Sequence, residues 1–172
     1  ASSTLRINGA GSSILGDVSM DGGVLDLNQS STLSGNLTLT GSPKLSLAGS
    51  TIFTYSGADV SIDTGETLQF DETGTYAGNL ILNGGLLDVD GTMDISGDIA
   101  QVADSTIDIA VGRTLSYLNS SPYAINANTL TLANAGAFKS AVVLNGSVLD
   151  VNANASLTGD LTITADSTMD IG

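Results

Sequence analysis

The stretch 79–96 reads NLILNGGLLDVDGTMDIS and decides the fold. It contains three short runs, LILN, LLDV and MDI, in which apolar residues recur at every second position, and Gly or Asp stands between the runs. A period of two indicates β-strands, and the Gly-rich separators indicate tight turns. Apolar residues do not recur anywhere at the helical spacing over about ten residues, so we predict an all-β protein.

A 62-residue repeat runs through the chain. The LLDV run of that stretch, at 86–89, recurs one period earlier as VLDL at 24–27 and one period later as VLDV at 148–151. Self-similarity at a fixed period is the signature of repeat architectures. We therefore expect a single β-solenoid domain built from stacked units. Its expected boundaries are 1–172 for the domain, 1–16 for a partial unit, and 17–78, 79–140 and 141–172 for the repeat units.

Each 62-residue unit, or superrepeat, contains a shorter period. Equivalent segments begin at residues 17, 36, 59 and 79, in steps of 19, 23 and 20 residues. Three short strands fit into each step, and strands that recur in this way stack in parallel, about 4.8 Å apart along the axis. We expect a parallel β-helix with three short strands in each turn, or rung, of about 20 residues, and a length of roughly 40 Å.

The alternation assigns two rows of apolar side chains to the interior of the coil. The first expected row is Leu25, Leu27, Leu45, Leu47, Leu68, Phe70, Leu87, Val89, Ile107, Ile109, Leu149, Val151, Met169 and Ile171. The second expected row is Leu37, Leu39, Val60, Ile62, Leu80, Leu82, Val142, Leu144, Leu161 and Ile163.

Two residues interrupt the second row. Gln101 stands in the column of Leu39, so we expect either a bulge that turns Val102 inward or a hydrogen bond from Gln101 to a backbone carbonyl. Pro122 stands at the place of a strand residue and cannot donate to a ladder. We expect that strand to start late, with Tyr123 or Ile125 reaching the core.

The composition excludes several kinds of chemistry. The 172 residues include 4 Lys and Arg against 18 Asp and Glu, a net charge of −14, and there is no His, Cys or Trp. A Ser-His-Asp triad, a thiol nucleophile, a disulfide framework and a His- or Cys-ligated zinc site are therefore excluded. The negative charge repels phosphate backbones and anionic headgroups, so we expect no nucleic-acid partner. No apolar run is long enough for a spanning helix, so we expect no membrane insertion.

Two turns of chain carry a family resemblance. SGNLTLTG at 34–41 followed by KLSL, and GNLILNGGLLDVDG at 78–91 followed by TMDISG, resemble the passenger repeats of bacterial autotransporters and filamentous-haemagglutinin-like adhesins. The resemblance extends over essentially the whole chain. It implies a right-handed parallel β-helix and an extracellular location at the bacterial cell surface, whereas it does not select an activity, because such passengers serve adhesive, enzymatic and structural roles.

The most regular polar feature is a row of outward residues, one per rung. In order, the row is Asp26, Ser46, Gln69, Asp88, Asp108, Thr131, Asp150 and Asp170. Asp88 is expected beside Asp108, and Asp150 beside Asp170, where like charges repel unless a hard cation such as Ca²⁺ binds the carboxylates. The alternative is a solvated acidic face that keeps the protein soluble and blunts lateral strand pairing.

The sequence favours a structural function over a catalytic one. Paired carboxylates could serve glycoside hydrolysis, and Asp with Lys or Arg could serve a polysaccharide lyase. The Asp pairs, however, recur with the repeat as a structural ladder does, and the few basic residues are scattered. We expect no catalytic and no cofactor-binding residues. The expected role is a stalk of a surface adhesin or a subunit of a surface filament. Its expected partners are copies stacked end to end, or flanking repeats of a longer chain, and a surface glycan. The alternative is a β-helix that binds or cleaves carbohydrate.

Overall fold

The computed structural model describes residues 3–152 and 154–172, and within these residues all regular secondary structure is β-strand. The strands lie on three faces of a coil, and every ladder between strands is parallel. Face A holds β1 (Thr4–Ile7), β4 (Val24–Leu27), β7 (Lys44–Leu47), β10 (Thr67–Phe70), β13 (Leu86–Val89), β16 (Ser105–Ile109), β19 (Thr129–Ala133), β22 (Val148–Val151) and β25 (Thr168–Ile171). Face B holds β2 (Ser12–Ile14), β5 (Ser31–Leu33), β8 (Thr51–Tyr55), β11 (Gly74–Ala77), β14 (Met93–Ile95), β17 (Thr114–Tyr117), β20 (Ala137–Lys139) and β23 (Ser156–Thr158). Face C holds β3 (Val18–Asp21), β6 (Leu37–Thr40), β9 (Val60–Asp63), β12 (Leu80–Asn83), β15 (Ile99–Ala103), β18 (Tyr123–Asn126), β21 (Val142–Asn145) and β24 (Leu161–Thr164).

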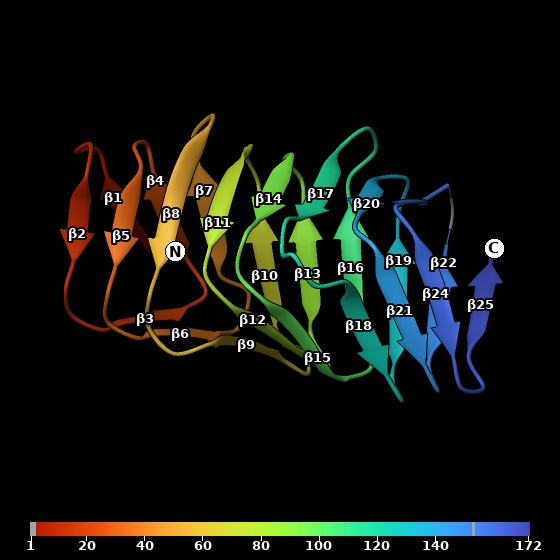
Figure 1. The fold of residues 1–172 in the computed structure, drawn as a ribbon. Coiled ribbons are helices and arrows are strands. Elements are labelled where there is room, and N and C mark those ends of the chain that lie inside the picture. Colours follow the sequence, from red (N-terminus) through yellow and green to blue (C-terminus); the bar gives the residue numbers. More distant parts are fainter. Residues whose placement is uncertain (1–2, 153) are drawn as a thin grey trace.

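The chain visits the faces in the order B, C, A and then begins the next rung (Figure 1). Followed from β2 to β25, the coil is right-handed (Figure 1). The predicted parallel β-solenoid with three strands per rung is therefore confirmed. Residues 3–152 and 154–172 contain no helix long and apolar enough to span a bilayer.

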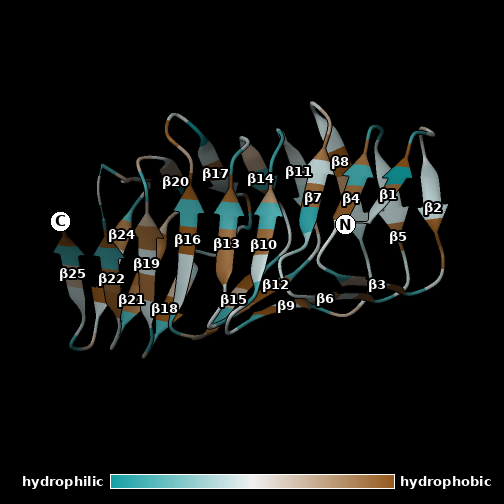
Figure 2. Ribbon diagram, turned by 180° about the vertical axis from the view of Figure 1, so that it is seen from behind, coloured by the Kyte–Doolittle hydropathy of each residue, from teal (hydrophilic) through white to brown (hydrophobic). Residues whose placement is uncertain are grey.

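One continuous core runs along the coil. The inward rows predicted from the alternation are buried from Leu25 to Val151. Hydrophobic and hydrophilic residues share single strands of face A, which is the pattern of a strand with one face in the core (Figure 2). The last rung differs: Ile171 is 69% exposed and Ile163 is 53% exposed. β24 and β25 keep the register of β21 and β22, so both residues occupy the inward positions predicted for them, but the described residues place no further rung over them.

Gln101 is buried and fully engaged in hydrogen bonds. Its Nε2 donates to the carbonyl oxygens of Thr129 at 2.7 Å and Ala103 at 3.2 Å, and its Oε1 accepts from the Tyr123 hydroxyl at 3.2 Å. The ladder with β12 does bulge at this point, but Val102 points outward and is 56% exposed. The predicted hydrogen bond to a backbone carbonyl is confirmed, and the predicted inward turn of Val102 is wrong because the amide itself is satisfied in the core.

The segment around Pro122 behaves as predicted. Strand β18 begins one residue after the proline, and the side chains of both Tyr123 and Ile125 are fully buried. The N–H of Tyr123 donates to the carbonyl oxygen of Ala141 in the next rung. Face C is interrupted here, since β15 and β18 belong to different sheets.

Candidate functional site

The outward row of face A was predicted to run without a break, and this prediction is wrong. Gln69 lies beside Lys44 and not beside Ser46, and Asp108 lies beside Ala133 and not beside Thr131. The ladder shifts by two residues at β7/β10 and again at β16/β19. A shift by two keeps every inward side chain inward, which explains why the alternation alone did not indicate it.

The structure brings together Asp88 and Asp108, which are paired in register on β13 and β16. Burial, followed by the nearby charges of Asp90 and Asp108, raises the pKa of Asp88, while Lys44 acts in the opposite direction. One carboxylate oxygen of Asp108 is buried and has no hydrogen-bond partner among the described residues. Three carboxylates therefore crowd this part of face A. In the part of the chain that the structure describes, Asp90 alone among them has a close donor, the side-chain amide of Gln69 at 2.6 Å.

Asp150 and Asp170 also lie side by side, on β22 and β25, but Asp150 is two rungs away from Asp108 on β16. Asp150 accepts hydrogen bonds from Asn152 at 3.1 Å and from Thr131 at 3.5 Å, whereas Asp170 is exposed on the last rung. Within the described residues no group of three or more Asp, Glu, His or Cys side chains is placed to hold a metal ion. Calcium at Asp88, Asp108, Asp150 and Asp170 remains a prediction.

Asp88→Asn is expected to stabilise the protein at pH 7 by about 0.5–1 kcal/mol, because it removes a like charge directly opposite Asp108. The folded protein raises the pKa of Asp88, so the wild type gains stability as the pH falls through that pKa toward 3.8. The variant lacks this gain. Urea denaturation at pH 7 and at pH 4 measures both effects. The exposed Asp166→Asn serves as the control, with a change within about 0.5 kcal/mol, and an equal effect from both variants would contradict the repulsion.

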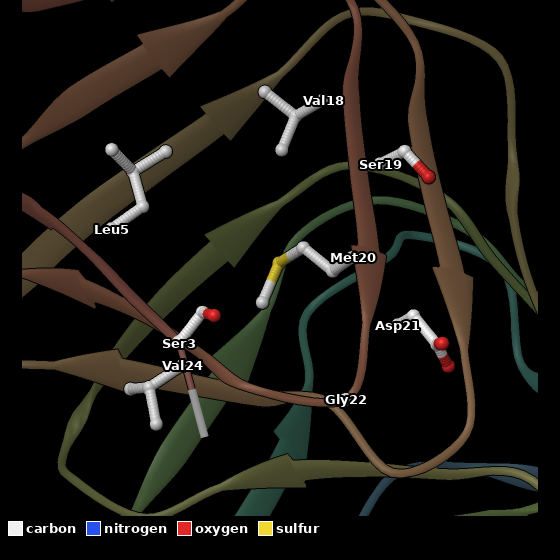
Figure 3. Close-up of a pocket in the computed structure, with 8 residues that line it drawn as sticks. All are labelled: Ser3, Leu5, Val18, Ser19, Met20, Asp21, Gly22 and Val24. Atoms are coloured by element: carbon white, nitrogen blue, oxygen red, sulfur yellow. The ribbon is translucent and has the colours of Figure 1, made fainter. Parts of the chain in front are cut away.

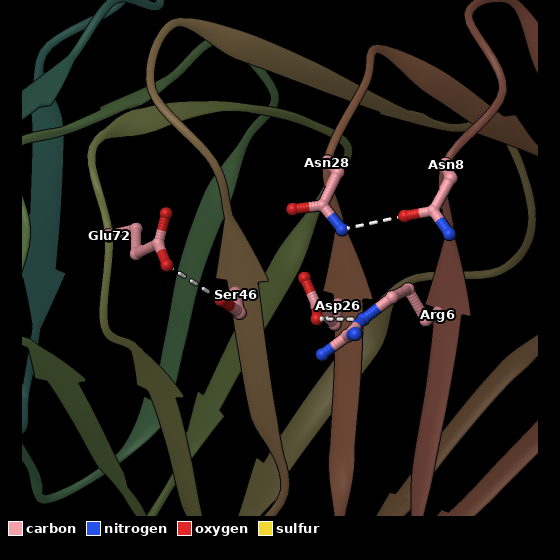
Figure 4. A network of polar contacts seen from close by, with 6 residues as sticks. All are labelled: Arg6, Asn8, Asp26, Asn28, Ser46 and Glu72. Carbon is pink, nitrogen blue, oxygen red and sulfur yellow. Dashed lines mark hydrogen bonds and ion pairs between the residues drawn. The ribbon is translucent and has the colours of Figure 1, made fainter.

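Polar side chains link neighbouring rungs at the start of face A. Figure 4 shows the ion pair between Arg6 and Asp26 at 2.6 Å and the hydrogen bond from Asn28 to Asn8 at 2.8 Å. Arg6 is largely exposed, so its ion pair adds at most about 1 kcal/mol to stability. These contacts join equivalent positions of successive rungs, which is the geometry of a structural ladder.

Two hollows of about 310 Å³ each open on the surface. The first lies at the first rung, and Figure 3 shows its lining of Ser3, Leu5, Val18, Ser19, Met20, Asp21, Gly22 and Val24. It exposes one edge of the core, where Leu5 is 47% exposed. The second is a groove along the interruption of face C between β15 and β18, with Asp98, Gln101, Tyr117 and Asn126 among its lining residues.

Asp98 and Tyr117 form the polar centre of this groove. The Tyr117 hydroxyl donates to Asp98 Oδ1 at 2.6 Å, and the Asn119 amide donates to the same oxygen at 3.4 Å. Burial and the Asp98 carboxylate raise the pKa of Tyr117 to about 12, so the phenol stays protonated. Sequence reasoning missed this groove. Its signals were the long 23-residue step and the recurrence of Tyr55 as Tyr117.

Comparisons with protein-family models, with curated proteins and with solved structures find no match for this chain. The strand topology identifies the chain as a right-handed parallel β-solenoid, and the comparisons assign it to no family.

Proposed function

We propose that this protein is a rigid, non-catalytic segment of the bacterial cell exterior, either the stalk of a surface adhesin or a subunit of a surface filament. The observation that carries the proposal is the single core that continues from Leu25 to Val151. Each rung repeats the same cross-section and adds about 4.8 Å of length. Such a coil is a spacer whose length is set by the number of rungs.

The surface chemistry supports an exposed rod. The net charge of −14 disfavours side-by-side association, and Asp side chains on face A discourage lateral strand pairing. Two of the four basic residues, Arg6 and Lys44, are held in ion pairs with Asp26 and Asp71. The resemblance of the turns at 34–41 and 78–91 to passenger repeats supports the bacterial surface as the location.

The terminal rungs of the structure support growth along the axis. Leu5 on β1, and Ile163 and Ile171 on the last rung, expose apolar side chains that occupy inward positions in their strands. A further rung would pair with these strands and cover the side chains. We propose that it comes from flanking repeats of the same polypeptide or from a second copy of the chain.

A variant with residues 79–140 duplicated directly after residue 140 is expected to form a longer rod. The two junctions join equivalent faces, so three rungs are added and the maximum dimension grows by about 14 Å. Small-angle X-ray scattering measures this length. A control that duplicates only residues 79–128 joins unequal faces and is expected to lose stability. A superrepeat duplication that does not lengthen the particle would contradict the spacer function.

Location and assembly need their own measurements. Protease treatment of intact cells that carry the protein should remove it if it lies on the surface, and protection from protease would contradict this.

Sedimentation velocity at rising concentration distinguishes the two forms of the proposal, because the mass of a filament subunit's assemblies grows with concentration whereas the mass of a stalk segment stays constant.

A second candidate function is carbohydrate binding, and the groove between β15 and β18 favours it. A carboxylate, an amide and hydroxyl groups line the groove, and these are the donors and acceptors that bind sugar hydroxyls. A glycan array identifies an oligosaccharide, and calorimetry then compares wild type with Asn126→Ala. Binding that weakens in the variant supports a site in the groove, whereas no binding to the array contradicts it.

A further inference from the structure

Face C is interrupted twice, and the interruptions are one superrepeat apart. Its three sheets are β3-β6, β9-β12-β15 and β18-β21-β24, so ladders are missing between β6 and β9 and between β15 and β18. The strands that precede the two gaps begin at Leu37 and at Ile99, which occupy equivalent positions in successive superrepeats. The gaps are therefore a property of the superrepeat.

The other two faces change register at the same rung boundaries. In a regular pair of face A strands the first inward residues are partners, as Leu25 and Leu45 are. At the gaps, the first inward residue of one strand pairs with the second inward residue of the next strand. Leu45 therefore pairs with Phe70, and Ile107 pairs with Leu132. On face B, Phe53 pairs with Ser31 of β5 on one side and with Tyr76 of β11 on the other, so the register shifts between β5 and β8 as well.

We call these two boundaries seams. Seam 1 separates β5, β6 and β7 from β8, β9 and β10, and seam 2 separates β14, β15 and β16 from β17, β18 and β19. Three complete rungs, from Thr51 to Ile109, lie between the seams. A regular rung boundary is held by ladders on all three faces, whereas a seam lacks the face C ladder, which elsewhere, as between β9 and β12, joins four residue pairs.

A tyrosine occupies each seam at equivalent positions. The backbone N–H of Leu37 donates to the Tyr55 hydroxyl at 3.0 Å across seam 1, and the Tyr117 hydroxyl donates to Asp98 at 2.6 Å across seam 2. The Tyr55 phenol thus satisfies the first strand N–H that the missing ladder leaves without a carbonyl partner, and the Tyr117 phenol links the two sides of seam 2 through the Asp98 carboxylate. The hydroxyls replace only a part of the lost ladder.

Aromatic packing follows the same division. Tyr76 packs against Phe53, Tyr55 and Phe70, all between the seams, and Tyr123 packs against Tyr117 and Phe138, all after seam 2. Every aromatic pair found in the described residues lies on one side of a seam. These contacts strengthen the rungs within each segment and add nothing across its boundary.

We infer that the solenoid opens at its two seams, so that the three rungs from Thr51 to Ile109 unfold as one cooperative unit. Both seams carry polar side-chain links: Lys44 is paired with Asp71 at 3.1 Å across seam 1, and seam 2 has two short links to Thr129. The Gln101 amide donates to the carbonyl oxygen of Thr129 at 2.7 Å, and the N–H of Thr129 donates to Asp104 at 2.6 Å. The inference concerns the fold itself and does not depend on where the protein acts.

Single-molecule force spectroscopy on the full chain, held at its two ends, tests the inference. Release of the three rungs between the seams should lengthen the chain by about 20 nm, from about 3.5 Å per extended residue. Steps of about 7 nm, which correspond to single rungs, would overturn it, as would release of the whole chain in one step of about 60 nm.

The tyrosine hydroxyl gives a matched pair of variants. Tyr55→Phe should speed opening at seam 1 about fivefold at constant force, because one hydrogen bond across that seam is lost, and should leave the step length unchanged. Tyr76→Phe is the control, since its hydroxyl has only a long contact of 3.5 Å to Asn79, within the same segment. An equal effect of both variants on the opening rate would contradict the assignment of an opening point to seam 1.

Discussion

Gly97→Ala is expected to lower the free energy of unfolding by about 3 kcal/mol, the upper part of the usual range for overpacking. Gly97 lies at the corner between β14 and β15, directly over Gly78 of the preceding rung. A Cβ on Gly97 would overlap the carbonyl group of Gly78 and come within 2.9 Å of the backbone nitrogen of Asn79. Backbone atoms held in a ladder cannot move aside as a flexible side chain can, so neighbouring rungs must separate locally.

The same corner provides the control. Gly35 and Gly159 repeat the close approach of Gly97, whereas a Cβ on Gly16, at the first rung of the column, meets nothing within 4 Å. Gly16→Ala should therefore change stability by less than about 0.5 kcal/mol. Urea denaturation measures both variants. A Gly97→Ala protein as stable as Gly16→Ala would show that this corner opens freely and that the rung spacing is not set there.

Most of the fold could be predicted from two periods in the sequence, the alternation of side chains within each strand and the 62-residue superrepeat. The alternation places Leu25, Leu87 and Leu149 in the core, and their equal spacing, one superrepeat each time, fixes which rungs are equivalent. Stacking in parallel follows, since equivalent strands can hydrogen-bond only to one another. The positions of Tyr123 and Ile125 follow from the inability of Pro122 to donate.

The register could not be predicted in the same way. A shift by two residues exchanges one inward residue for another, so Leu45 meets Phe70 as readily as Leu68 when only the alternation is considered. The 23-residue step is the visible trace of the shift, because the longer rung has residues to spare. Consequently the outward row of face A, which runs from Asp26 to Asp170, was predicted as continuous when it is divided.

The candidate sites were harder to predict than the core, for a physical reason. Asp98 and Tyr117 lie in neighbouring rungs and meet only where face C lacks a ladder, a feature that the local sequence of either residue does not carry. Gln101 was recognised as an exception to its row, but two of its three partners, Thr129 and Tyr123, come from the next rung and depend on the seam. Departures from a repeat indicate where to look, and the three-dimensional register decides what meets there.

Tyr76→Ala is expected to have the largest effect, a loss of about 3–5 kcal/mol in the free energy of unfolding. Tyr76 is fully buried on β11, and its ring lies 5.8 Å from Phe70, 5.9 Å from Phe53 and 6.5 Å from Tyr55 between ring centroids. Truncation removes three aromatic contacts and leaves a cavity in rungs whose backbone ladders prevent collapse.

Two further variants separate the ring of Tyr76 from its surroundings. The superrepeat places Phe138 at the equivalent position, so Tyr76→Phe should cost less than about 1 kcal/mol. The neighbouring Thr75, whose side chain points away from the core, should tolerate alanine with a change of about 0.5 kcal/mol. Urea denaturation compares the three proteins, and hydrogen exchange locates the effect, which should be strongest in peptides from 51–109. A loss below about 1 kcal/mol for Tyr76→Ala would contradict a rigid core, because it would mean that the rungs close over the cavity.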